Sequence, residues 1–158
     1  MGKIERKYLA HYINATAGEQ EAVYVRLGED LEEYKAELSA QVDTSKNILG
    51  ATAVRISGYE KTSAVEPFYA KAGDPLFEKL QAIIDGQLVL DELKTDVVEV
   101  KLWQEGENGY PAVKETAYIE VISYGGDTTG YQIPFKLHFT GEKVNGNFDV
   151  SGKTFTAA

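Results

Sequence analysis

The chain has 158 residues, enough for one domain with a full core, and its 43% hydrophobic and 26% charged residues are ordinary for a globular protein. Its 25 acidic and 16 basic residues give a formal net charge of −9, which argues against a protein that binds nucleic acid through its phosphates. The absence of cysteine excludes disulfides and thiolate chemistry, and no apolar run approaches the roughly 20 residues of a membrane span.

Most of the chain predicts β-strands. Alternation of apolar and polar residues, together with many Ile, Val and Tyr, marks six segments in chain order: 8–13, 22–27, 52–59, 97–103, 117–124 and 131–139. In the last of these, Pro134 cannot donate a ladder hydrogen bond, so we expect an edge strand or a bulge there. Near the C-terminus, Asn145-Gly146 is typical of a type I′ hairpin turn.

One helix is predicted over about residues 74–85. Asp74 suits the N-cap, Pro75 the first helical position, and Gly86 a left-handed C-terminal residue. The apolar residues at helical spacing form one stripe that should pack on a sheet: Leu76, Phe77, Leu80, Ile83 and Ile84.

The segment 31–42, "LEEYKAELSAQV", fits two structures. Leu31, Tyr34, Leu38 and Val42 follow helical spacing, whereas its even-numbered residues from Tyr34 onward follow strand spacing. Its Glu, Lys and Ala content favours a helix. The pattern alone leaves both structures open.

The glycine-rich stretch "ISYGGDTTGYQIPF", residues 122–135, raises the question of phosphate binding. A Walker loop needs Gly-Lys-Ser/Thr and a following helix, but here no lysine follows and the next residues predict a strand. We therefore interpret it as a hairpin loop whose glycines supply positive φ angles.

No residue pattern indicates catalysis, a metal or a cofactor. His11 and His138 stand alone, outside any HExxH-like pair, and there is no G-x-S-x-G elbow. The acidic residues Glu29, Asp30, Glu32 and Glu33 lack EF-hand spacing; a solvated face is the favoured interpretation, with a weak cation site as the alternative. We expect a non-enzyme without cofactors.

Three stretches in the same order along the chain resemble major tail tube proteins of long-tailed bacteriophages and phage-tail-like particles. They are "KIERKYLAHYINA", "SKNILGATAVRISGYEKTSAVEPFYAKAGDPLFEKLQAIIDG" and "ISYGGDTTGYQIPFKLHFTGEKVNGNFD". The resemblance covers almost the whole chain, but no stretch is a mechanistic motif, so its specificity lies in the combination.

The resemblance implies a mainly β (α+β) fold: an antiparallel β-sandwich or half-barrel flanked by the one helix, as a single tail-tube domain over residues 1–158. It also implies long assembly loops or arms, and it favours a strand over a helix for residues 33–42. The connector after that strand then becomes a candidate assembly loop: Asp43, Thr44, Ser45, Lys46, Asn47, Ile48 and Leu49.

The function that the resemblance implies is a structural virion protein made in the host bacterial cytoplasm. Its copies would form stacked hexameric rings, a hollow tail tube through which DNA passes at ejection without specific binding. Tape-measure and tail-end proteins would be its other partners, and no membrane is involved. Two rival hypotheses are a monomeric β-sandwich module that binds carbohydrate or a surface partner, and a small hydrolase with a carboxylate pair.

Overall fold

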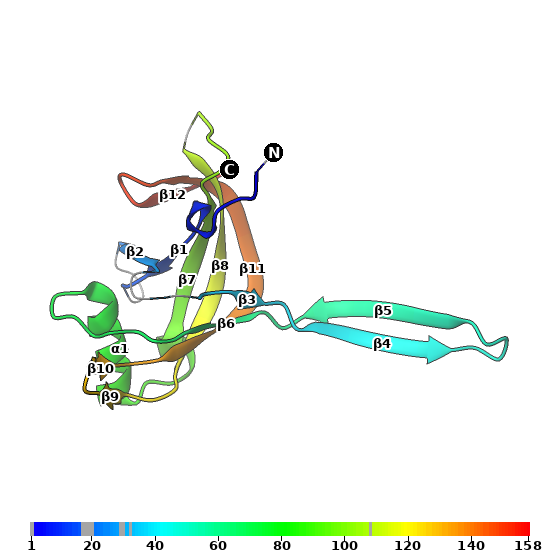
Figure 1. The fold of residues 1–158 in the computed structure, drawn as a ribbon, viewed down its shortest axis with the longest axis horizontal. Coiled ribbons are helices and arrows are strands. Elements are labelled where there is room, and N and C mark those ends of the chain that lie inside the picture. Colours follow the sequence, from blue (N-terminus) through cyan, green and yellow to red (C-terminus); the bar gives the residue numbers. More distant parts are fainter. Residues whose placement is uncertain (1, 17–20, 29–30, 32, 108) are drawn as a thin grey trace.

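The fold is a curled antiparallel sheet with one helix and one projecting hairpin (Figure 1). The structure, a computed structural model, describes residues 2–16, 21–28, 31, 33–107 and 109–158. The main sheet curls into a half-barrel, and the described part of the chain has a single α-helix, so the predicted fold class is confirmed. That part of the chain contains no helix long and apolar enough to cross a membrane.

The main sheet has eight strands, with the order β2-β1-β7-β8-β11-β6-β3 and with β12 paired to β11. All of its pairs are antiparallel. Its strands are β1 (Leu9–Asn14), β2 (Tyr24–Leu27), β3 (Ala36–Glu37), β6 (Thr62–Val65), β7 (Lys94–Lys101), β8 (Tyr110–Val121), β11 (Phe135–Asp149) and β12 (Thr154–Ala157).

Helix α1 (Pro75–Gly86) begins as predicted and covers one face of this sheet. The Asp74 side chain accepts a hydrogen bond from the Leu76 amide at 3.0 Å, and Pro75 occupies the first helical position. The predicted apolar stripe faces the core: Leu76, Leu80 and Ile83 are buried, and Phe77 and Ile84 pack against them. The C-terminal expectation was wrong by one residue, since Gln87 rather than Gly86 adopts the left-handed conformation.

The two faces of the sheet carry separate apolar clusters because side chains alternate along each strand. The larger cluster lies under α1 and includes Ile13, Val97, Ile119 and Phe135. The smaller cluster, centred on Phe148, lies on the opposite face and is closed by the half-buried Phe155 of β12. Two 3₁₀ turns, Arg6–Tyr8 and Leu90–Leu93, precede β1 and β7.

The glycine-rich stretch forms a small hairpin of β9 (Gly125–Asp127) and β10 (Gly130–Gln132), as the turn interpretation predicted. Its three glycines have φ angles of 141°, 110° and 153°. Pro134 then separates β10 from β11. The hairpin turn predicted at Asn145-Gly146 was wrong: both residues lie inside the continuous strand β11 and pair with β8, and Gly146 also pairs with β12.

Gly146 is needed for a different reason than a turn. A Cβ atom there would collide with the backbone carbonyl oxygen of Thr156, and would lie 3.0 Å from the Ala157 Cα. The glycine therefore permits the close approach of β12, which closes the smaller apolar cluster.

Candidate assembly surface

The most unusual feature of the molecule is a hairpin formed by β4 (Ala40–Lys46) and β5 (Thr52–Tyr59). These strands pair only with each other and project away from the half-barrel (Figure 1). Every residue of β4 is exposed, and in β5 only Gly58 is partly covered. The hairpin also resolves the ambiguity over residues 31–42: the described part contains β3 and the start of β4, so the helix favoured by propensity was wrong.

The hairpin is amphipathic although both of its faces are exposed in the described part of the chain. Directly opposed residues share a face, and the register places Val42 opposite Ile56 and Thr44 opposite Val54. These three apolar side chains are 54%, 54% and 65% exposed, in the order Val42, Ile56 and Val54. The other face is polar, with Asp43 opposite Arg55. One face of the arm is therefore suited to burial, yet none of the described residues covers it.

The tip of the hairpin presents two more apolar side chains on an ordered turn. The Asn47 side-chain oxygen accepts hydrogen bonds from the amides of Leu49 at 2.9 Å and Ala51 at 3.0 Å, and Gly50 adopts a φ of 83°. Ile48 and Leu49 are 102% and 87% exposed. Their side chains thus point into solvent from a turn that its own hydrogen bonds hold in place.

The predicted assembly loop corresponds to the outer half of this hairpin. The structure differs in one respect, since Asp43 to Lys46 form the end of β4 and only the following residues form the turn. Sequence reasoning named the tip residues but missed the apolar face. The alternation in 52–59 does place Val54 and Ile56 on one side, yet it cannot show that this side faces solvent.

The other residues considered in the sequence do not assemble into a site. His11 lies 3.8 Å from Glu99 and His138 lies 2.6 Å from Glu120, on different strands and opposite faces of the sheet. Of the acidic group, Glu29, Asp30 and Glu32 lie outside the described residues, while Glu33 pairs with Lys35 at 3.2 Å. The described residues contain no group of three or more potential metal ligands.

Buried polar side chains hold the half-barrel in register. Burial raises the pKa of Tyr24, and its hydroxyl donates a hydrogen bond to Asp96 at 2.6 Å, which raises the pKa further. Burial also raises the pKa of Tyr34 to about 12, against a smaller lowering by its 2.8 Å hydrogen bond with Ser63. The Tyr24 hydrogen bond links the edge strand β2 to β7, and the Tyr34 hydrogen bond links the segment before β3 to β6.

The comparisons with known proteins add no relative. No protein-family model matches the sequence, and a search of curated proteins finds no match. The fold and the projecting β4–β5 hairpin are therefore the features that bear on function.

Proposed function

We propose that this protein is a self-assembling structural protein whose copies form stacked hexameric rings, the hollow tail tube of a bacteriophage or phage-tail-like particle. The single observation that carries the proposal is the projecting β4–β5 hairpin with its exposed apolar face and tip. The half-barrel with one flanking helix supports it, because that is the fold which the sequence resemblance implies.

The energetics of the hairpin favour a partner. An isolated two-stranded hairpin is at best marginally stable in water, and large apolar side chains are rarely left exposed together without a binding role. Ile48, Leu49, Val42, Val54 and Ile56 all keep more than half of their surface in water. Burying a fully exposed side chain of this kind is worth roughly 1.5–3 kcal/mol, so the set, scaled by its exposed fractions, supplies about 5–11 kcal/mol in gross terms.

That gain is comparable to the roughly 4–15 kcal/mol that association costs in lost freedom of motion. One hairpin contact is therefore marginal by itself. In a ring, each subunit both inserts its hairpin and receives one from a neighbour, and ring closure makes the later contacts intramolecular. A marginal pairwise contact then gives subunits that are soluble singly and stable once assembled.

The same proposal covers the remaining partners. The tube would be a non-enzymatic part of the virion, synthesised in the bacterial cytoplasm, and would meet tape-measure and tail-end proteins. DNA would pass through the lumen without specific binding, since a lumen that neutralised phosphates would hold DNA and stall its passage. The net charge of −9 per chain supports weak binding of DNA.

The test is electron microscopy and sedimentation of the concentrated full chain, beside the double variant Ile48→Ser/Leu49→Ser. We expect rings or tubes from the natural sequence and only monomers from the variant. Because both side chains are almost fully in water, the variant should change the free energy of unfolding by no more than about 0.5 kcal/mol.

A matched control lies on the polar face of the same hairpin. Ala53→Ser, opposite Ser45, adds one hydroxyl without touching the apolar face and should assemble normally. A natural chain that remains monomeric at all concentrations would overturn the proposal and favour a binding module. Tubes formed equally well by the double variant would show that the hairpin tip is not the contact.

A further inference from the structure

A pocket of about 280 Å³ lies on the helix-bearing face of the sheet, in the half that the helix leaves uncovered. Strand alternation explains its composition. Each polar residue lies two positions along its strand from a residue of the apolar core, and so on the same face: His11 from Ile13, Glu99 from Val97, and Glu115 from Ala117. The sheet face therefore changes from apolar to charged where α1 ends.

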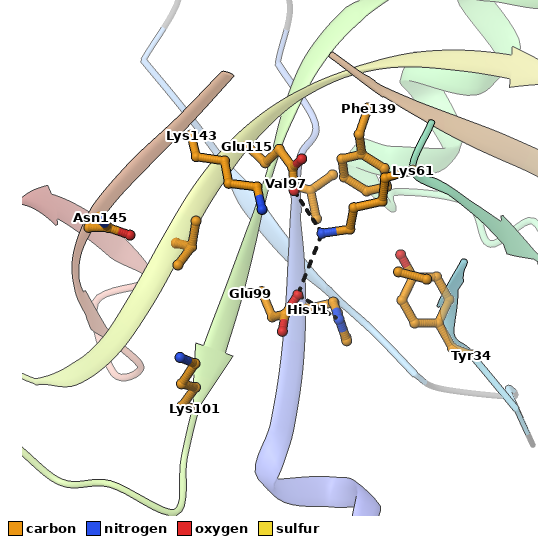
Figure 2. Close-up of a pocket in the computed structure, with 12 residues that line it drawn as sticks. His11, Tyr34, Lys61, Val97, Glu99, Lys101, Glu115, Phe139, Lys143 and Asn145 are labelled. Atoms are coloured by element: carbon orange, nitrogen blue, oxygen red, sulfur yellow. Dashed lines mark hydrogen bonds and ion pairs between the residues drawn. The ribbon is translucent and has the colours of Figure 1, made fainter. Parts of the chain in front are cut away.

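Three lysines line this pocket: Lys61, Lys101 and Lys143. Figure 2 shows the ammonium groups of Lys61 and Lys143 on one side of Glu99 and that of Lys101 on the other. They come from three separate segments, so only the folded sheet brings them together. Val97, Val113, Phe139 and Ala36 are the apolar part of the lining, whereas Lys143 and Asn145 at its outer side are exposed to water.

The two carboxylates in the pocket already have partners. Lys61 donates to Glu115 at 2.7 Å, and both side chains are largely buried, at 16% and 6% exposure. Glu99 lies 3.8 Å from His11 and 3.9 Å from Lys61. The neighbouring His11 is the main cause that lowers the pKa of Glu99, and the charges of Lys61 and Lys101 add to it against the opposing effect of burial, so the ionised form of this carboxylate is favoured.

Lys101 and Lys143 are held less closely, because within the described part of the chain neither makes a hydrogen bond or an ion pair shorter than 4.0 Å, although the charge of Lys101 helps to lower the pKa of Glu99. Lys143 is brought opposite Glu115 by an irregularity in β11, where the register with β8 shifts between Phe139 and Lys143. Gly141 at the shift has a φ of 91°. Such bulges re-aim side chains and are common beside binding sites.

We propose that this pocket is an anion-binding site that takes a carboxylate or phosphate group, held by the flexible side chains of Lys101 and Lys143 that line it, with the amide of Asn145 as a further donor. The lining has three lysines and two glutamates, so it is locally positive in a chain whose net charge is −9.

The experiment is titration of the full chain with inorganic phosphate and, separately, acetate, followed by NMR shifts at Lys101, Lys143 and Asn145. Sodium chloride at matched ionic strength serves as the reference. We expect saturable shifts confined to the pocket, and about tenfold weaker binding in each of Lys101→Gln and Lys143→Gln. Lys46→Gln, on the exposed hairpin, is the matched control and should bind as the natural chain does.

The source of the anion is tested by varying the protein concentration. A phosphate affinity that falls as copies associate identifies the natural group as a carboxylate of a second copy; an affinity independent of concentration identifies a free anion. Shifts that chloride reproduces, or unchanged affinity in both lysine variants, would overturn the site. Neither result depends on whether the hairpin drives assembly, because the Ile48→Ser/Leu49→Ser variant can be titrated in the same way.

Discussion

The variant Leu80→Ala tests how α1 is docked on the sheet. Leu80 is 0% exposed and lies in the larger apolar cluster with Ile13 and Phe135. Truncation removes three buried carbons, about 2.4 kcal/mol at roughly 0.8 kcal/mol per buried CH₂, and the cavity left behind adds to this. We expect a total loss of about 2–5 kcal/mol in the free energy of unfolding.

The assay is urea denaturation followed by circular dichroism, with the slope of the transition compared between variants. In a protein of this size, the expected loss lowers the melting temperature by roughly 4–20 °C. Leu90→Ala is the matched control, because Leu90 is 80% exposed and should change stability by about 0.5 kcal/mol or less. Equal effects of the two variants would refute the docked helix.

Two further predictions concern the buried tyrosine and the crowded glycine. The pKa of Tyr34 is raised to about 12 from 10.0. Its contribution to the free energy of unfolding is therefore complete below pH 10 and falls by up to about 3 kcal/mol as the pH rises through 12. Tyr34→Phe should flatten this alkaline loss of stability in pH-dependent denaturation; an unchanged profile would contradict the assignment. Gly146→Ala should push β12 away at a cost of about 1–3 kcal/mol and accelerate amide exchange at residues 154–157, whereas unaltered exchange there would argue against the close contact.

Local signals in the sequence determined the helix. The Asp74 cap, Pro75 and the apolar stripe act within a few residues of one another, so the sequence specifies them directly. The strand regions were recoverable for the same reason, because alternation is a property of neighbouring residues. The fold class and the position of Ile48 and Leu49 in an exposed connector followed from such patterns and from the family resemblance.

Only the tertiary structure decided the features that depend on pairing between distant segments. Propensity favoured a helix at 31–42, but β4 gains its hydrogen bonds from β5, which begins beyond the turn. Asn145-Gly146 reads as a turn locally, yet β8 and β12 hold it extended from both sides. The lysine pocket likewise joins Lys61, Lys101 and Lys143 across the sheet. Strand partners and converging charges are set by non-local packing, whose free energy exceeds the small local preferences that a sequence pattern reports.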